Sequence, residues 1–134
     1  MDAAVLREFG KPPKCEQFPD PEAGKGEVIV HVHAAALKPI DKQLADGSHY
    51  AAPRQLPVVC GTDGVGHLSD GQRVFFGGCR PPYGSMAQRT VVPCAFTFPG
   101  ETVETVSGTI SPPFLPLRVR KPSWAAYTRL LPVL

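Results

Sequence analysis

The chain has 134 residues, of which 43% are hydrophobic and 19% charged, and its formal net charge is +2. That length is enough for one domain with a real core but short for two domains. Because the basic residues are scattered and the charge is nearly neutral, neither a nucleic acid nor an anionic membrane surface is predicted as a partner.

The composition also bears on location and on cysteine chemistry. No apolar run approaches the roughly eighteen residues of a membrane span, and no basic start precedes a hydrophobic stretch, so neither a span nor a signal peptide is predicted. The cysteines are widely spaced and form no C-x-x-C pair, which favours free thiols in a reducing cytoplasm over disulfides or a zinc knuckle. They are Cys15, Cys60, Cys79 and Cys94.

In chain order, the pattern predicts short strands joined by turns, with one brief helix. Residues 27–35 give the strongest strand signal, because their side chains alternate between two faces, with His31 and His33 on the same one. A hairpin is expected at the Asp70-Gly71 turn signal. Strands are predicted at residues 3–6, 15–18, 27–35, 58–68, 73–76 and 85–92, and the helix at residues 40–45. Thirteen Gly and sixteen Pro suit this mainly β fold with minor helix, a barrel or a sandwich.

From Gly100 the character of the sequence changes. Closely spaced prolines interrupt every apolar run, so no helix of useful length is expected before Ser123. We therefore divide the chain into a folded domain at residues 1–99 and a proline-rich, divergent tail at residues 100–134. The sequence leaves open whether this tail is a natural terminus, a gene fragment or the product of a disturbed reading frame.

Two motifs about twenty residues apart carry a resemblance to a known family. Residues 37–41 read L-K-P-I-D, and residues 56–66 read L-P-V-V-C-G-T-D-G-V-G. They resemble the L-N-P-x-D and P-x-x-x-G-x-[DE]-x-x-G signatures of the medium-chain dehydrogenase/reductase superfamily, and within it the zinc-independent quinone oxidoreductase branch. The resemblance covers residues 1–99 and implies a partly open, chaperonin-10-like β-barrel, the substrate-side domain of the family.

The resemblance also implies an activity for the complete family enzyme. There, hydride passes from NADPH to a quinone, enone or carbonyl substrate, while the barrel shapes the substrate pocket. Such enzymes continue for ~200 residues that hold the cofactor, and no Rossmann domain is expected in this chain. The resemblance offers one further interpretation of residues 100–134, as a truncated lead-in to that absent cofactor domain. We therefore expect the chain alone to be inactive, to bind no NADPH and to lack the family's homodimer interface. The alternative is a non-catalytic β-barrel module that binds a small molecule or a partner.

The glycines of the second motif invite comparison with a dinucleotide-binding loop. Gly61, Gly64 and Gly66 give G-x-x-G-x-G, which is the wrong spacing, and a turn signal follows them instead of a helix. We interpret these glycines as permitting a close backbone approach or a bulge in a strand.

No metal site is predicted. Zinc alcohol dehydrogenases of the same superfamily have a cysteine ligand where this chain has Lys38 and a histidine ligand where it has Thr62, so no zinc is expected. His31 and His33 could together chelate a metal. Because no third ligand is evident, we favour two solvated histidines on a polar strand face.

The resemblance places Lys38 and Tyr50 nearest to the chemistry, because the L-N-P-x-D segment and an aromatic residue after it border the family's cleft. Lys38 replaces the usual Asn and either donates to a carbonyl or extends into solvent. Tyr50 either orients or protonates a reduced carbonyl, or covers the end of the barrel.

Four further residues are expected to face the substrate or the cofactor: Asp41, Thr62, Asp63 and Tyr83. Two of them have alternative roles, since Asp41 suits a helix cap and Asp63 suits the backbone of its own Gly-rich turn. Tyr83 shares the loop at residues 77–84 with Arg80, and both suit a carbonyl or an anionic group.

Overall fold

The structure is a computed structural model that describes residues 1–100 and 129–132. Strands dominate the described part, and α1 is its one α-helix. The elements are β1 (Asp2–Leu6), β2 (Lys14–Gln17), β3 (Glu27–Leu37), α1 (Pro39–Asp46), β4 (Val58–Val59), β5 (Asp63–His67), β6 (Arg73–Gly77), β7 (Arg89–Pro93), the 3-10 turn η1 (Cys94–Phe96), β8 (Thr97–Pro99) and β9 (Arg129–Pro132).

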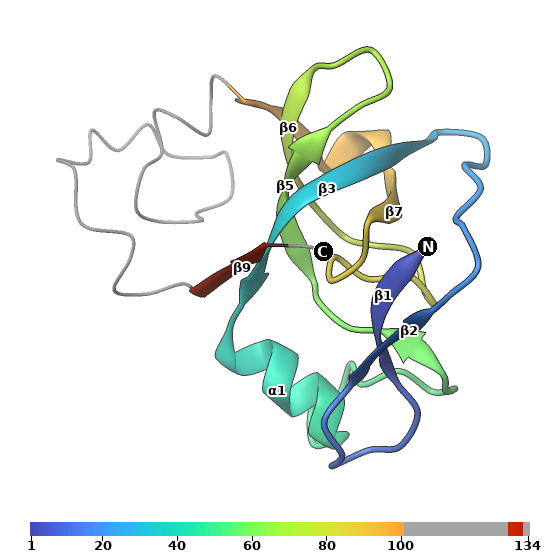
Figure 1. Cartoon of the computed structure of the whole chain (residues 1–134), viewed down its shortest axis with the longest axis vertical. Coiled ribbons are helices and arrows are strands. Elements are labelled where there is room, and N and C mark those ends of the chain that lie inside the picture. Colours follow the sequence, from blue (N-terminus) through green and yellow to red (C-terminus); the bar gives the residue numbers. More distant parts are fainter. Residues whose placement is uncertain (101–128, 133–134) are drawn as a thin grey trace, which may run out of the picture.

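The strands form two antiparallel sheets. The smaller sheet has the order β2-β1-β4, and the larger has the order β7-β3-β5-β6-β8, with β9 also paired to β3. Figure 1 shows β3 as a long, curved strand that crosses the molecule, with α1 following from its end. β7 pairs with the first half of β3 and β9 with the second half, and both lie on the edge opposite β5. The prediction of a mainly β, partly open barrel is confirmed.

Two details of the predicted strands differ from the structure. The strand expected at residues 58–68 is split into β4 and β5, which belong to different sheets. The strand expected at residues 85–92 begins only at Arg89, because the backbone before it bonds to β1 instead: the Ala4 N–H donates to the Met86 carbonyl at 2.8 Å. A residue-by-residue pattern does not specify these changes of partner, since the apolar character continues through both segments.

The core consists of two groups of buried apolar side chains. One lies under the small sheet around Val5 and Val59, and the other under the large sheet around Val30 and Phe76, which are both fully buried. The hydrophobic effect that drives their burial also fixes strand register, because a slip of one residue would expose the apolar face.

A bulge in β3 determines where the histidines lie. The register of β3 against β5 shifts between Val32 and Ala34, so the simple alternation predicted for this strand ends there. His31 stacks on His67 of β5, with ring centroids 5.2 Å apart and planes 10° apart, whereas His33 is exposed.

Close packing explains the glycines of β5. A Cβ on Gly64 would lie 2.5 Å from the Ala34 carbonyl oxygen and 3.0 Å from the ring of Phe76, too close for any side chain. After β5 the chain turns at Asp70-Gly71 into β6 and does not enter a helix. The interpretation of a close backbone approach is therefore confirmed, and no dinucleotide-binding turn is present at this position.

Helix α1 holds one side of the candidate site. Lys38 is its N-cap, Pro39 opens its first turn, and Gly47 ends it. In the part of the chain that the structure describes, no helix is long and apolar enough to cross a membrane.

The predicted tail contains one described element. β9 lies within residues 100–134 and pairs in antiparallel register with Ala34–Leu37 of β3. The rest of the tail, from residue 101 to 128 and at 133–134, lies outside the described residues.

Candidate functional site

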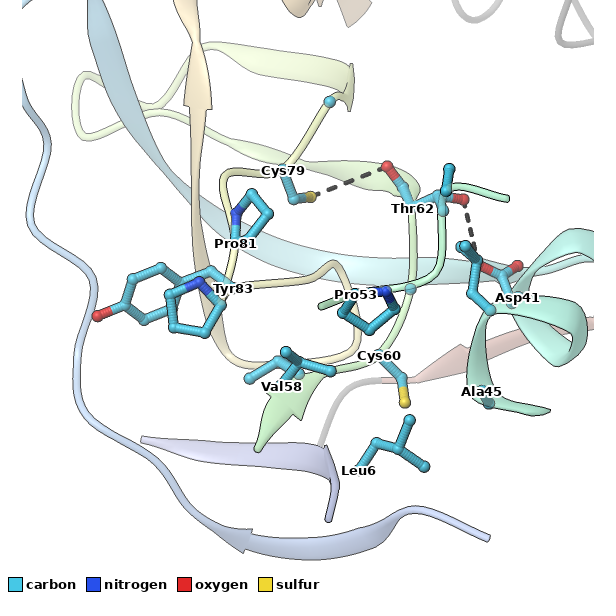
Figure 2. Close-up of a pocket in the computed structure, with 16 residues that line it drawn as sticks. Leu6, Asp41, Ala45, Pro53, Val58, Cys60, Thr62, Cys79, Pro81 and Tyr83 are labelled. Carbon is cyan, nitrogen blue, oxygen red and sulfur yellow. Dashed lines mark hydrogen bonds between the residues drawn. The ribbon is translucent and has the colours of Figure 1, made fainter. Parts of the chain in front are cut away.

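A cleft of about 260 Å³ lies between α1, the connection from β4 to β5, and the loop at residues 77–84. Figure 2 shows Asp41 and Thr62 at the α1 end of the cleft, with Pro81 and Tyr83 on the far side. Much of its wall is apolar, including Leu6, Leu44, Ala45, Pro53, Val58 and Val59. Such a space, apolar with a few convergent polar groups, is the usual form of a small-molecule site.

The polar end of the cleft is a cluster of four side chains from the two sequence motifs: Lys38, Asp41, Thr62 and Asp63. The Lys38 ammonium forms an ion pair with the Asp63 carboxylate. The Thr62 hydroxyl lies 3.1 Å from Asp41 Oδ1 and 3.0 Å from Asp63 Oδ1. The structure thus brings together four of the six residues predicted for the site, which we call the polar cluster.

Local structure explains why Asp41 is buried there. It is the third residue of α1, and its Oδ2 accepts a hydrogen bond of 2.8 Å from the Lys38 N–H. This is the helix-capping role predicted for it, since the first N–H groups of a helix lack intrahelical acceptors. Asp41 is only 6% exposed, so the cap also places a carboxylate at the wall of the cleft.

Asp63 is bonded to the side chains of its neighbours in the polar cluster. It begins β5, is 5% exposed, and its carboxylate accepts from the Lys38 ammonium and the Thr62 hydroxyl. This carboxylate is therefore bonded to side chains of the polar cluster, and its expected place facing the substrate or the cofactor stays a prediction. Burial makes an unpaired carboxylate costly, which is the physical reason for the pairing with Lys38.

Thr62 is the member of the polar cluster best placed to act on a ligand. Thr62 and Asp41 line the cleft, whereas Lys38 and Asp63 are not among its lining residues. A hydroxyl has one proton, so Thr62 donates to only one of the two carboxylates at a time. The hydroxyl can therefore turn from a carboxylate toward a ligand oxygen without breaking the rest of the cluster.

Two of the free cysteines line the same cleft. Burial, and then the Asp41 carboxylate, raise the pKa of Cys60 to about 11. Burial also raises the pKa of Cys79 to about 11, with Asp63 acting in the same direction, and its thiol lies 3.8 Å from the Thr62 carbonyl oxygen. Both thiols are therefore protonated near neutral pH and are poor nucleophiles.

Tyr50 is not part of the polar cluster. It lies in the turn after α1, is 96% exposed, and its ring lies against His49 with centroids 4.3 Å apart. No direct contact between Tyr50 and the cleft is present in the described structure, so its catalytic role stays a prediction.

The loop at residues 77–84 is held by contacts within the protein. Tyr83 lines the cleft, but its hydroxyl donates to the Asp20 carbonyl at 3.2 Å and points away from Thr62 in Figure 2. Arg80 donates to Glu27 Oε2 at 2.8 Å and to the Glu22 carbonyl at 2.9 Å. These polar groups are engaged in anchoring the loop, which was not predicted.

Among the described residues, no group of three or more His, Cys, Asp or Glu side chains is arranged to hold a metal ion. His31 and His67 stack instead of converging on a common point. At the position of the family zinc ligands, the ammonium of Lys38 and the hydroxyl of Thr62 are already hydrogen-bonded to carboxylates. The donor set therefore does not fit the usual Cys/His zinc site.

The ion pair between Lys38 and Asp63 and the thiols of Cys60 and Cys79 were the site features that sequence analysis missed. A signal for the pair was present, because Lys38 and Asp63 belong to the two family motifs and carry opposite charges. Nothing in the sequence placed the two cysteines at one cleft, since 19 positions separate them along the chain.

Comparisons with known proteins agree with the geometry. The chain is 38% identical over 69 residues to an alcohol dehydrogenase of Rhizobium meliloti, a match covering 52% of this chain and 20% of that protein. No protein-family model matches the chain. Thus the chain spans about a fifth of the length of that curated relative.

Solved structures give a longer match. A quinone oxidoreductase of Thermus thermophilus, solved alone and with NADPH, is 31% identical with a TM-score of 0.65 over 74% of this chain and 31% of its own. A quinone oxidoreductase of Coxiella burnetii is 28% identical with a TM-score of 0.66 over 74% of this chain and 36% of its own. The likeness therefore covers most of the described residues and about a third of each of these proteins.

Proposed function

This chain belongs to the medium-chain dehydrogenase/reductase superfamily as its N-terminal, GroES-like part, and we propose that it supplies the substrate side of an NADPH-dependent oxidoreductase. The reaction is hydride transfer to a quinone, an enone or another carbonyl compound. The observation that carries the proposal is the apolar cleft with the Thr62 hydroxyl at its polar end.

The cleft residues suit the binding of such a substrate. Apolar walls bind the carbon skeleton through the hydrophobic effect. Thr62 donates a hydrogen bond to the carbonyl oxygen and so orients it, and this bond strengthens as negative charge develops on that oxygen. Lys38 acts as a positioning residue, because it neutralises Asp63, which lessens the competition of that carboxylate for the Thr62 proton; Asp41 is the other acceptor that the substrate oxygen must replace.

The described residues do not fit the pyrophosphate of NADPH. A Cβ on Gly61 would collide with the Ser85 hydroxyl, so this glycine serves internal packing and leaves no open backbone cradle. In the described structure β5 is followed by β6 and not by a helix, so no helix N-terminus lies there to receive the phosphates. In the complete enzyme the cofactor would bind to a different part, and the chain described here has the tasks of orienting the substrate and excluding water.

Zinc independence and a cytoplasmic location are part of the same proposal. The first is supported by Lys38 and Thr62 at the positions of family zinc ligands. The second is supported by the thiols, since all four cysteines, two of which are exposed, are free. The partner is a small molecule, and neither a nucleic acid nor a membrane is proposed.

The proposal is tested by ligand binding to the chain itself. We use 4-acetylbenzamide, an uncharged aryl ketone that does not alkylate thiols, and follow amide signals by NMR. Binding with a roughly millimolar Kd and shifts at Thr62 and Cys60 are expected. Thr62→Ser keeps the donor and should retain binding, whereas Thr62→Val, which has nearly the same shape, should weaken it about tenfold.

Two results would separate this proposal from a non-catalytic binding module. Calorimetry with NADPH near a millimolar should give no heat for this chain, and a low-micromolar Kd would contradict the assignment to the substrate side alone.

Genomic DNA read past the codon of Leu134 in three frames should encode a βαβ unit with G-x-G-x-x-G. A stop codon in the native frame without such a unit in any frame would favour the module.

A further inference from the structure

We infer that the cleft discriminates by charge: it accepts uncharged or cationic carbonyl compounds and excludes anionic ones, and Asp41 is the residue that sets this preference. The carbonyl class rests on the proposed function, whereas the charge preference rests on the cleft's own residues.

Asp41 gives the cleft its electrostatic character. Among the described residues that line the cleft, it is the only one of the Asp, Glu, Lys, Arg and His types. Its carboxylate is 6% exposed, so water screens its field much less than it would at the surface. An anion in the cleft would therefore lie close to a buried negative charge.

The nearby cations do not offset this charge inside the cleft. The Lys38 ammonium is bound to Asp63, so these two charges cancel and Asp41 remains. Arg80 is bound to Glu27 on the outer side of the loop. Arg54 follows the lining residue Pro53 but is exposed, where its attraction for an anion is weakened by water and salt.

Two thiols at the cleft wall show that a negative charge is disfavoured there, by burial and by the carboxylates. Deprotonation of Cys60 or Cys79 places a negative charge at the cleft wall, just as an anionic ligand would. Burial and the neighbouring carboxylates raise the pKa of each thiol from 9.0 to about 11. Burial is the larger cause at both thiols and would disfavour a cation as well; only the contribution of the carboxylates, Asp41 for Cys60 and Asp63 for Cys79, depends on the sign of the charge.

Matched ligands test the inference. The pair 4-acetylbenzamide and 4-acetylbenzoate have nearly the same shape and the same ketone but differ by one negative charge. NMR titration of the intact chain at 150 mM salt should give at least tenfold weaker binding for the benzoate. The cation 4-acetylbenzamidinium should bind at least as tightly as the benzamide, because desolvation alone would weaken both ions.

Asp41→Asn tests the residue. The amide keeps an oxygen acceptor for the Lys38 N–H but removes the charge, so the gap between benzamide and benzoate should fall to about threefold or less. If this variant does not fold, the order of the three ligands on the unchanged chain still decides the charge preference.

The outcomes are distinct. Equal binding of benzamide and benzoate, or rejection of the amidinium together with the benzoate, would overturn the charge preference and leave the proposed function standing. A folded Asp41→Asn chain with an unchanged gap would overturn the role of Asp41. If none of the three ligands binds at the cleft, the proposed function fails first, and the charge preference fails with it.

Discussion

The Lys38 ammonium and the Asp63 carboxylate form an ion pair that joins the N-cap of α1 to the first residue of β5. The two residues are 25 positions apart, and each belongs to one of the two motifs on which the family resemblance depends. The Lys38 side chain is 28% exposed and that of Asp63 is 7% exposed, so the pair lies at the border of the interior. The ion pair therefore links the start of α1 to the large sheet at the polar end of the cleft.

Replacing Lys38 with Met should destabilise the chain by about 2 kcal/mol, because a nearly buried carboxylate loses its ionic partner. The free energy of unfolding in urea measures the effect. Lys42→Met is the matched control, since Lys42 is exposed on the same helix, and its effect should stay within about 0.5 kcal/mol. Adding Asp63→Asn to the Lys38→Met chain should restore at least half of the loss. A Lys38→Met chain as stable as the unchanged one would show that the pair contributes little.

Gly64→Ala should be strongly destabilising, by about 2 kcal/mol or more, because the new methyl group collides with backbone and with a buried ring. Gly77→Ala is the control within the same hairpin, since its Cβ would meet its nearest atom at an ordinary 3.8 Å. Thermal unfolding followed by circular dichroism compares the two. Similar melting temperatures for both variants would contradict the close approach of β5 to β3.

Alkylation with N-ethylmaleimide should distinguish the four cysteines. Cys60 and Cys79 react through a thiolate that forms only as the pH approaches about 11, so their rates should continue to rise across pH 7 to 10. At pH 7.5 they should be modified at least tenfold more slowly than the exposed Cys15 and Cys94, as peptide mass spectrometry would report. In urea the difference should disappear. Fast labelling of Cys60 in the folded chain would show that its thiol is not protected.

Zinc removal should leave the protein unchanged. The purified chain should contain far less than one zinc per molecule, and EDTA should not lower its melting temperature, because the cluster at the family zinc position is hydrogen-bonded and contains no cysteine or histidine. Elemental analysis is the measurement. Near-stoichiometric zinc that survives dialysis would place a metal elsewhere, and His31→Ala would then test the face with the stacked histidines.

Local chemistry was sufficient to predict much of the fold. The alternation at residues 27–35 predicted β3, and the Asp70-Gly71 turn predicted the hairpin of β5 and β6. The capping role of Asp41 was expected from an aspartate at the start of the predicted helix. These features depend on neighbours in the chain, which a sequence displays directly.

Only the tertiary structure decided how the site residues are used. The sequence placed Lys38, Asp41, Thr62 and Asp63 in two motifs, but the pairing of Lys38 with Asp63 depends on how the fold brings the start of α1 to the start of β5. That pairing occupies the Lys38 ammonium and leaves Asp41 as the charge at the cleft wall, where its carboxylate accepts from the Thr62 hydroxyl. The physical reason is that a buried charge takes whichever partner the fold brings within reach, and that partner is set by contacts between segments far apart in the chain.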